Sequence, residues 1–564
     1  MEETRGATAV SGPIHAGSPD AEIWALEVDR TFKTFQSLIA IGQCLLQKER
    51  PLQAAVTAQI AAHYASYNHP GQFYSLRLEQ LIRAISDYES PHSRLSAGYT
   101  FKHRDIKRVL HVLTAAKPVG GDSRYVWRWI RRDPHRQHFV ALTQQMAHEV
   151  PRPLLDAVAM ANGSVHVLDS ERENVLKRAQ KLRRIAESFD VVVLHVYPED
   201  VVPLIAFANK SGIPPILFVA QADHQFCIGV SASDLMVPLR EAGARIAVAR
   251  RGMPADRMAL LPIPIDLNAP TLSKFEARLR LGLSEHQIVL LSIARSVKYT
   301  PIEGPSFPEV LVPVIEKYQD AILFVVGPDN INQWKSAGER TQGRIRALGQ
   351  RSDTELLYQA ADIYLDSFPF ASNTSLLEAG THGLPLVSYC PFSREAYVLA
   401  AGAPGIEQTL VRTTAIGEFQ EAVTLLIDDP TYRVQLGAKT REEIVDAHCG
   451  DSWNRCLREL YQKTAALSSH CDPWIDGSVS RVGELDVLLR RFYSGSEPLG
   501  WVIGWYARHL GYLARIQLLL ALSEVDRSFS FSMFLPMPVG RWLGARMKGW
   551  RKWPILGWAL SAKG

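Results

Sequence analysis

The sequence predicts an α/β protein with two doubly wound, Rossmann-like domains in tandem and helical extensions at both ends. Short apolar runs alternate with amphipathic helical segments over two stretches of the chain. A proline-rich connector at 261–266 separates the two stretches, and prolines hold such a connector extended. We therefore assign 105–266 to an N-terminal domain and 267–466 to a C-terminal domain, and we expect ligands to bind in the cleft between them.

The first stretch begins with a βαβ unit. A buried strand is expected at 107–114, followed by the Gly120-Gly121 loop, a helix at 123–131 and a strand at 137–142. The later elements of this domain follow from the same alternation. Strands are expected at 165–168, 191–195, 216–219 and 246–249, with helices around 171–187, 201–211 and 231–243.

The second stretch repeats the alternation of strands and helices. A helical segment, 417–466, closes it. Strands are expected at 288–293, 321–326, 344–348, 363–367 and 386–389, with helices at 307–318, 354–361 and 374–381.

The two ends of the chain do not show the alternation of strands and helices that is expected in the middle. Residues 1–20 are rich in Gly, Ala and Ser and are expected to be disordered, whereas 21–104 shows helical spacing of apolar residues. The extension 467–564 is expected to be helical, and its last part, 527–564, is basic, rich in Trp and without acidic residues. Such a tail suits docking on an anionic membrane surface; the alternative is a helix packed on the α/β core.

Composition excludes several classes of protein. The formal charge of +4 over 564 residues does not indicate bulk nucleic-acid binding. The six cysteines form no C-x-x-C pair, which fits a reducing compartment and argues against structural zinc. The sequence shows neither a signal peptide nor a run of 18 uncharged apolar residues. We expect a cytoplasmic protein, peripheral on the inner membrane face if the tail docks there, with no metal site.

The most informative motif is the helix-like run 373–385, which begins Asn373-Thr374-Ser375 and carries Glu378 one turn later. A helix N-terminus offers unpaired N–H groups and a positive dipole end, which suits phosphate. Thr374, Ser375 and Glu378 share one helix face. Asn373 has two interpretations, because it either caps the helix or helps to bind phosphate. Lys298 follows the first strand of the same domain and is expected to neutralise a diphosphate.

Three segments together resemble the donor half of GT-B glycosyltransferases: 298–301, 361–369 and 373–385. The pattern is most similar to protein O-GlcNAc transferases and bacterial protein N-glucosyltransferases. The resemblance covers about 288–392 and implies that Lys298 contacts the diphosphate, Thr374 and Ser375 hold phosphate, and Glu378, where that family usually has Asp, holds ribose. Retaining GT-B enzymes, which it resembles more loosely, carry a glutamate eight positions before this carboxylate. Here that position is Phe370, so stereochemistry stays open.

Two further donor-side candidates lie at strand ends of the second domain. Arg295 precedes Lys298 after the first strand, and the turn 349–353 follows the third. The resemblance implies that Gln350 and Arg351 in this turn receive the nucleobase. The alternative is an ordinary turn in which Asp353 caps the next helix.

The acceptor side is expected in the first domain. Asp223 and His224 follow the strand 216–219, where a base for an acceptor hydroxyl is expected; the alternative is a histidine satisfied in the domain interface. His195, with the nearby Glu199-Asp200 pair, is a second-tier candidate. Gly120 and Gly121 allow close approach of backbone to a ligand, although a plain tight turn explains them equally well.

These observations give one leading hypothesis. The protein transfers a sugar from a nucleotide-diphosphate sugar, most simply a UDP-sugar, to a glycan, lipid-linked or protein acceptor in polysaccharide biosynthesis, without cofactor or metal. One alternative is a GT-B epimerase acting on the sugar nucleotide itself. The other is a noncatalytic scaffold of the same fold at a membrane surface.

Overall fold

A computed structural model describes residues 19–89, 105–118, 120–170, 173–267, 270–302, 304–467, 482–494, 497–523 and 525. The segment 1–20, expected to be disordered, lies outside this range except for its last two residues, which begin helix α1. The basic tail 527–564 lies wholly outside it. No described helix combines the length and apolar character that a membrane span requires.

The first domain contains a six-stranded parallel sheet in the order β3-β2-β1-β4-β5-β6. Its strands are mostly buried, as expected of a parallel sheet covered by helices on both faces, whereas the edge strand at 165–167 is half-buried. The strands are β1 (Arg108–Leu113), β2 (Gln137–Leu142), β3 (Val165–Val167), β4 (Val191–His195), β5 (Ile216–Ala220) and β6 (Leu235–Pro238), and the helices are α4 (Gly121–Arg132), α5 (Arg152–Met160), α6 (Val175–Ala186), α7 (Val201–Phe207) and α8 (Glu241–Ala249).

The second domain also contains a six-stranded parallel sheet, in the order β12-β11-β10-β7-β8-β9. When β7 is counted as the first strand and the sheet is read from the β9 edge, this is the strand order of the first domain, 3-2-1-4-5-6. Each sheet therefore reverses its strand order beside its first strand, which is the Rossmann topology. The GT-B fold class predicted from the sequence is confirmed. The strands are β7 (Ile288–Ile293), β8 (Ala321–Val326), β9 (Ile345–Ala347), β10 (Ile363–Leu365), β11 (Leu386–Tyr389) and β12 (Leu410–Thr413), and the helices are α9 (Lys274–Arg280), α10 (Phe307–Lys317), α11 (Asn332–Arg340), α12 (Thr354–Ala360), α13 (Asn373–Thr381) and α14 (Ile416–Asp428).

One stretch of the first domain was predicted wrongly. The strand expected at 246–249 is the end of helix α8, and the helix expected at 231–243 contains the four-residue strand β6. The buried positions of α8 are Ala242, Gly243, Ala244, Ile246 and Ala247, whose spacing of three and four residues is that of a helix and not of a strand. Strand β12, which was not predicted, is also only four residues long and alternates in exposure at the sheet edge.

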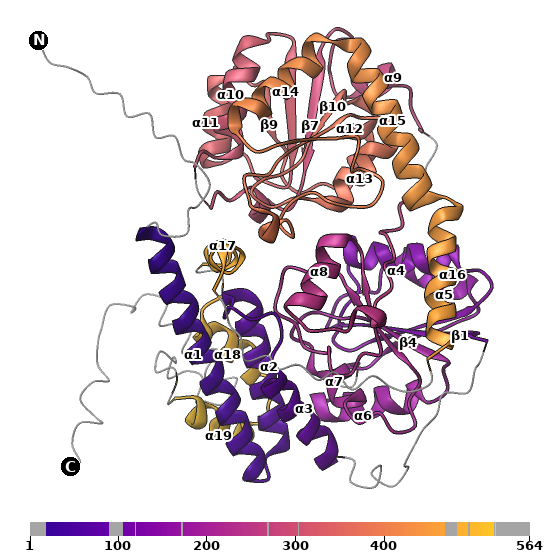
Figure 1. Cartoon of the computed structure of the whole chain (residues 1–564), viewed down its shortest axis with the longest axis vertical. Helices are drawn as coiled ribbons and strands as arrows, with labels where there is room; N and C mark the ends of the chain where they lie inside the picture. Colours follow the sequence, from indigo (N-terminus) through magenta and orange to yellow (C-terminus); the bar gives the residue numbers. More distant parts are fainter. Residues whose placement is uncertain are drawn as a thin grey trace, which may run out of the picture.

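Two long helices run along one side of both domains (Figure 1). Helix α15 (Pro430–Cys449) packs against α13 and α14 of the second domain, and α16 (Asp451–Ala465) follows it directly. Trp453 and Leu460 of α16 are buried against Val109 and Trp129 of the first domain. The chain therefore crosses back to the domain that it left at the proline-rich connector.

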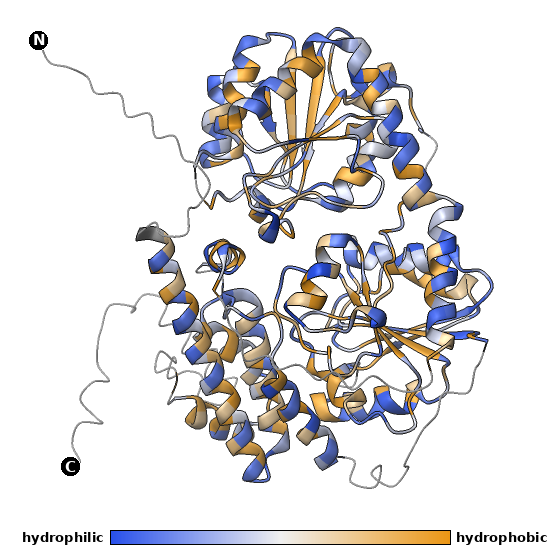
Figure 2. Cartoon of the chain, viewed as in Figure 1, coloured by the Kyte–Doolittle hydropathy of each residue, from blue (hydrophilic) through white to orange (hydrophobic). Residues whose placement is uncertain are grey.

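The helical extensions from the two ends of the chain lie side by side next to the first domain (Figure 1). Hydrophilic and hydrophobic residues are interspersed along these helices (Figure 2), and α2 (Pro51–Asn68) is buried along most of its length. For example, the Nδ1 atom of His63 lies 2.8 Å from the hydroxyl oxygen of Tyr506, 443 positions later. The helices are α1 (Pro19–Gln47), α2 (Pro51–Asn68) and α3 (Leu76–Glu89) from the first extension, and α17 (Glu484–Phe492), α18 (Leu499–Ala507) and α19 (Tyr512–Leu522) from the second.

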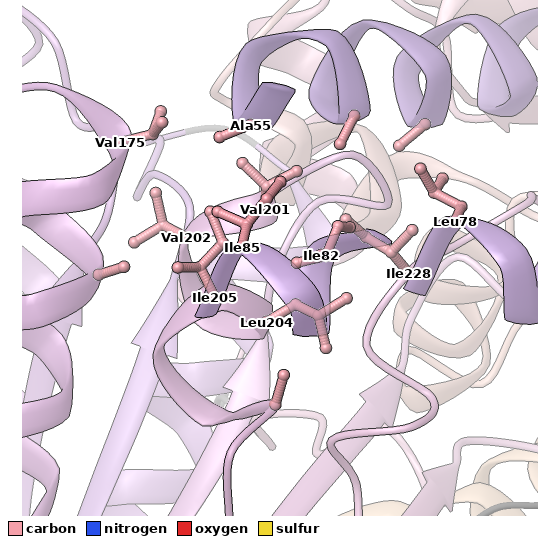
Figure 3. Close-up of a cluster of buried hydrophobic side chains, with 14 of the residues drawn as sticks. Ala55, Leu78, Ile82, Ile85, Val175, Val201, Val202, Leu204, Ile205 and Ile228 are labelled. Carbon is pink, nitrogen blue, oxygen red and sulfur yellow. The ribbon is translucent and has the colours of Figure 1, made fainter. Parts of the chain in front are cut away.

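A shared hydrophobic core joins the first extension to the first domain. Figure 3 shows Leu78, Ile82 and Ile85 of α3 packed against Val201 and Ile205 of α7. Buried Glu79 strengthens this contact, because its carboxylate accepts three backbone hydrogen bonds from the loop 229–231. The extension is thus an integral layer of the first domain.

The docking of α16 gives a testable prediction. Trp453 is fully buried, and its Nε1 donates a 2.7 Å hydrogen bond to the carbonyl oxygen of Pro262 in the connector. Trp453→Ala should lower the free energy of unfolding by about 4 kcal/mol, because it leaves a cavity and an unpaired carbonyl. Urea denaturation followed by circular dichroism measures the change.

Val434→Ala on the exposed face of α15 is the control, with an expected change below about 0.5 kcal/mol. Equal unfolding midpoints for the Trp453→Ala variant and the unsubstituted chain would contradict this packing.

Candidate functional site

Lys298 lies in the short 3-10 helix η3 (Ser296–Tyr299), directly after β7. Its Nζ donates a 2.6 Å hydrogen bond to the carbonyl oxygen of Ala371, two residues before α13 begins. The same nitrogen lies 4.8 Å from the centroid of the Phe370 ring. The structure therefore brings the amine to the start of the helix that carries Thr374 and Ser375, as the order of the strand ends predicted.

The N-terminus of α13 has unused hydrogen-bond donors. Among the residues that the structure describes, none accepts a hydrogen bond from the backbone N–H groups of Asn373, Thr374 and Ser375. Asn373 does not cap the helix, since its Oδ1 accepts from the N–H of Gly402 at 3.1 Å. Three donors and the positive end of the helix dipole are therefore available to an anion.

The loop of the first domain approaches the same helix. Gly120 has φ +133°, a conformation that favours glycine, and a Cβ atom placed on Gly121 would lie 3.0 Å from Thr374 Oγ1. Gly121 is the first residue of α4, so the N-terminal ends of α4 and α13 face each other across the two domains. Both positive dipole ends act on one small region.

Charge in this region is concentrated and only partly compensated. Burial and the nearby Arg295 lower the pKa of Lys298 to about 7, and Asp366 opposes this shift. Burial raises the pKa of Asp366, whose carboxylate accepts 2.9 Å hydrogen bonds from the N–H groups of Ser367 and Ser372. Asp366 thus orders the segment that leads into α13.

Glu378, expected to hold ribose, joins the two domains. Its Oε1 accepts from Nη1 of Arg124 at 2.7 Å and from Nη2 of Arg128 at 2.9 Å, both on α4. Within the described part of the chain no donor reaches Oε2. Sequence reasoning missed both arginines; their spacing of four along α4 was the available signal.

Gln350 and Arg351 lie in the turn after β9, at the carboxyl edge of the second sheet. Arg351 Nε donates to Oδ1 of Asp353 at 2.8 Å. Asp353 occupies the N-cap position of α12, but its side chain accepts no hydrogen bond from the helix backbone. Asp353 thus holds the N-cap position that the alternative interpretation expected, although its side chain pairs with Arg351 instead of with the helix.

The structure separates the roles of Asp223 and His224. Both oxygens of Asp223 accept from Arg240, at 2.7 and 3.0 Å, and Arg240 also donates to the carbonyl oxygens of Val398 and Ala400 in the second domain. This guanidinium holds the pKa of the Asp223 carboxyl well below its usual range against the opposing effect of burial. Asp223 therefore fixes the position of Arg240, and Arg240 joins the two domains.

His224 is half-buried beside the aromatic residues of the interface. Its ring centroid lies 4.5 Å from that of Phe370, which also contacts Lys298. Burial lowers the pKa of His224, with Asp223 opposing and the nearby Lys298 and Arg240 assisting. The imidazole is neutral at neutral pH and is able to accept a proton.

His195 is part of a buried chain of histidines in the first sheet. His195 Nε2 lies 3.0 Å from His111 Nδ1, and His111 Nε2 lies 2.9 Å from His138 Nδ1. Burial lowers the pKa of His195 to about 3. His195 also packs against Tyr125 and Trp129 in the core, and none of its described contacts joins it to the other candidates.

No described group of three or more His, Cys, Asp or Glu side chains is arranged to hold a metal ion.

No protein-family model matches the sequence, and no curated protein matches it. Solved structures of similar fold include Anabaena HepE in complex with UDP and glucose, at 15% identity and a TM-score of 0.46, covering 63% of this chain and 99% of that chain.

Two other solved structures show comparable similarity. A glycosyltransferase from Rickettsia africae has 12% identity and a TM-score of 0.49, covering 64% of this chain and all of its own. The O-GlcNAc transferase of Thermobaculum terrenum has 14% identity and a TM-score of 0.47, covering 79% of this chain and 83% of its own. At this level of identity we infer function only from the residues of this chain.

The bridge formed by Asp223 gives a second prediction. Asp223→Asn should destabilise the protein by about 3 kcal/mol, because it leaves buried Arg240 without its counter-charge. Thermal denaturation measures the loss. Glu241→Gln removes a charge from an exposed carboxylate of the same domain and should leave the melting temperature unchanged. Equal melting temperatures for all three proteins would show that Asp223 does not brace the domains.

Proposed function

We propose that the protein is a glycosyltransferase that moves a sugar from a nucleotide-diphosphate sugar, with a UDP-sugar as donor. One observation carries the proposal: the Lys298 amine, the free N–H groups of α13 and the N-terminal end of α4 meet at one place. A diphosphate is the ligand that suits such a convergence, because each element favours negative charge.

The same groups supply the chemistry of transfer. As the bond between sugar and diphosphate breaks, negative charge develops on the leaving oxygen. Lys298 and the helix N–H groups stabilise that charge, and Thr374 and Ser375 add hydroxyl donors. In our proposal these residues perform the neutralisation that a metal ion performs in other sites, and the reaction needs no cofactor.

The remaining donor contacts follow from position. Oε2 of Glu378 is available to a ribose hydroxyl while Oε1 stays with Arg124 and Arg128. The turn that carries Gln350 and Arg351 is assigned to the nucleobase, and Arg295 adds positive charge beside Lys298. These residues share the carboxyl edge of the second sheet, where ligands of doubly wound domains bind.

His224 is our candidate for the base that takes the proton from the acceptor hydroxyl. Its ring and the Lys298 amine both contact Phe370. We assign Phe370 as an apolar surface for the transferred sugar, with the base and the leaving-group cation both beside it. Asp223 Oδ1 lies 3.5 Å from His224 Nδ1, and the Asp223 carboxylate also pairs with Arg240. We therefore assign Asp223 to orienting His224 and not to accepting the proton.

The membrane surface is a separate proposal. We propose that the basic tail 527–564 docks on an anionic lipid surface. The described helices directly before it support this, because α18 and α19 expose Trp501, Leu513 and Leu520. Exposed apolar side chains next to a basic, Trp-rich segment suit the interface between headgroups and acyl chains.

Calorimetric titration of UDP tests the proposed function. Lys298→Met should weaken UDP binding by about 10- to 100-fold, because a hydrogen bond between charged groups is lost. The control is Lys335→Met, which removes an exposed lysine of the same domain and should not change the affinity. Absence of UDP binding by the unsubstituted protein would end the proposal.

The same titration has a pH dependence of known sign. The free amine loses its proton near pH 7, whereas a bound diphosphate raises its pKa, so the complex keeps the proton. UDP affinity should therefore fall as the pH rises above 7, approaching about tenfold per pH unit. Titrations at pH 8 in two buffers of different ionisation enthalpy should show proton uptake, and Lys298→Met should abolish it.

Product analysis with UDP-sugars distinguishes the alternatives. A transferase should release UDP slowly from its donor even without acceptor, and more slowly after substitution of Lys298. Conversion of the donor into a different sugar nucleotide would indicate an epimerase. Tight UDP binding with no turnover under any condition would indicate a noncatalytic scaffold.

Deletion of 527–564 tests the membrane proposal. The full chain should sediment with vesicles of phosphatidylcholine and phosphatidylglycerol, and the truncated chain should stay in the supernatant. Vesicles of phosphatidylcholine alone are the control, because they lack the negative surface charge. Sedimentation that does not depend on the tail would contradict docking through this segment.

A further inference from the structure

Glu199 is a buried carboxyl group with one oxygen that has no hydrogen-bond partner. The residue is 8% exposed, and its Oε2 is fully buried with no partner among the described residues. The neighbouring Asp200 is the opposite case, because its carboxylate accepts from Thr114, Thr143 and the N–H of Val202. Asp200 thus serves the fold as a helix cap, whereas Oε2 of Glu199 has no such role.

Its position in the sheet is informative. Glu199 lies in the loop between β4 and α7, at the carboxyl end of β4. Strand β4 pairs with β1, whose own loop carries Gly120 and Gly121, and the strand order of the sheet reverses between these two strands. Ligands of doubly wound domains bind at this switch point.

Helix α2 of the first extension covers the Glu199 side chain. His63 Nδ1 lies 3.8 Å from Glu199 Oε1, and His63 Nε2 is hydrogen-bonded to Glu497 in the connection between α17 and α18. Tyr67, one turn further along α2, lies 4.9 Å from His63 between ring centroids. The Tyr67 hydroxyl has no partner in the described part of the chain.

Ring contacts link the cluster of Glu199, His63 and Tyr67 to His224, the proposed base. The rings of Tyr67 and Tyr493 lie 5.8 Å apart between centroids, and Tyr493 lies parallel to His224 at 6.5 Å. Arg295 acts electrostatically on both tyrosines. The unpartnered carboxyl, the free phenol and the proposed base therefore border one continuous region.

We propose that Glu199, Tyr67, His63 and Glu497 form the acceptor subsite, and that it binds an uncharged saccharide through its hydroxyl groups. This inference rests on the proposed function. Carboxyl and phenol groups exchange hydrogen bonds with sugar hydroxyls, and the faces of Tyr67 and Tyr493 suit the apolar side of a sugar ring. Burial raises the pKa of Glu199, and the nearby His63 opposes this shift.

Charge decides against an anionic acceptor. Glu199, Glu497 and Asp200 act on this region together, and His63 is the nearby basic partner that the two glutamates share. A phosphate or carboxylate on the acceptor would meet carboxyl groups here, whereas the cationic donor side lies beside Lys298. The donor side therefore favours an anionic group, and the region around Glu199 favours an uncharged one.

Saturation-transfer NMR with p-nitrophenyl β-glucoside and p-nitrophenyl β-galactoside, in the presence of saturating UDP, tests the subsite. Both neutral glycosides should bind the unsubstituted protein, and glucose 1-phosphate should bind more weakly. Glu199→Gln and Tyr67→Phe should each weaken glycoside binding by about fivefold or more while UDP affinity stays within about twofold. Tyr67→Phe removes one hydroxyl group only, so it preserves packing if Glu199→Gln folds poorly.

Glu187→Gln is the matched control, because it makes the same change at an exposed residue that directly follows α6, near the opposite edge of the sheet where β4 begins. It should leave glycoside binding unchanged. Glycoside binding that survives both test variants, tighter binding of the sugar phosphate, or no glycoside binding while UDP binds would overturn the subsite. Absence of UDP binding by the unsubstituted protein would instead overturn the proposed function and the subsite with it.

Discussion

The approach of α4 to α13 is the constraint on which the rest of the site depends. Gly121 and Thr374 lie so close that a methyl group on the glycine would press against the threonine hydroxyl. Two positive helix ends and a buried lysine are therefore held close together. Burial, together with the nearby Arg295, lowers the pKa of Lys298, so the charged form of the amine carries a free-energy cost here. A ligand with negative charge relieves it, which is why affinity and charge neutralisation come from the same residues.

Arginines hold this unfavourable arrangement in place. Arg124 and Arg128 of the first domain pair with Glu378 of the second. Arg240 of the first domain pairs with Asp223 of its own domain and donates to two carbonyl oxygens of the second domain. Each guanidinium has several donors in a fixed plane, so one side chain satisfies partners from both domains. Among the described residues, Lys298 pairs with none of these carboxylates, whereas His224 Nδ1 lies 3.5 Å from Asp223 Oδ1. The bracing contacts and the proposed chemistry thus meet at Asp223 and Glu378.

The sequence predicted the sheets well and the cross-domain contacts poorly, for physical reasons. Strands β4 and β7 are continuous apolar runs, which are typical of buried strands. Strand β6 was missed because its apolar residues run on into those that precede α8, and β12 was missed because its four residues include the exposed Arg412. Lys298 and α13 were found because both follow strands of one sheet. The partners of Glu378 and Asp223 were missed, because they lie on other elements, 250 and 254 positions away for Glu378 and 17 positions away for Asp223, and the sequence does not show which elements meet. Glu199 was noted only with its neighbour Asp200, because burial without a partner is invisible in a sequence.

The two passages of the chain between the domains are tied to each other. The N–H of Ile265 in the connector donates to the carbonyl oxygen of His448 at the end of α15, and His448 in turn contacts the carbonyl oxygen of Ile263. Because these two passages are joined side by side, they limit twisting of one domain against the other. The domains are also joined away from the connector, where Arg240 donates to the carbonyl oxygens of Val398 and Ala400 and where Ile246 shares a buried cluster with Phe370. The interface between the domains is therefore fixed in two separate places.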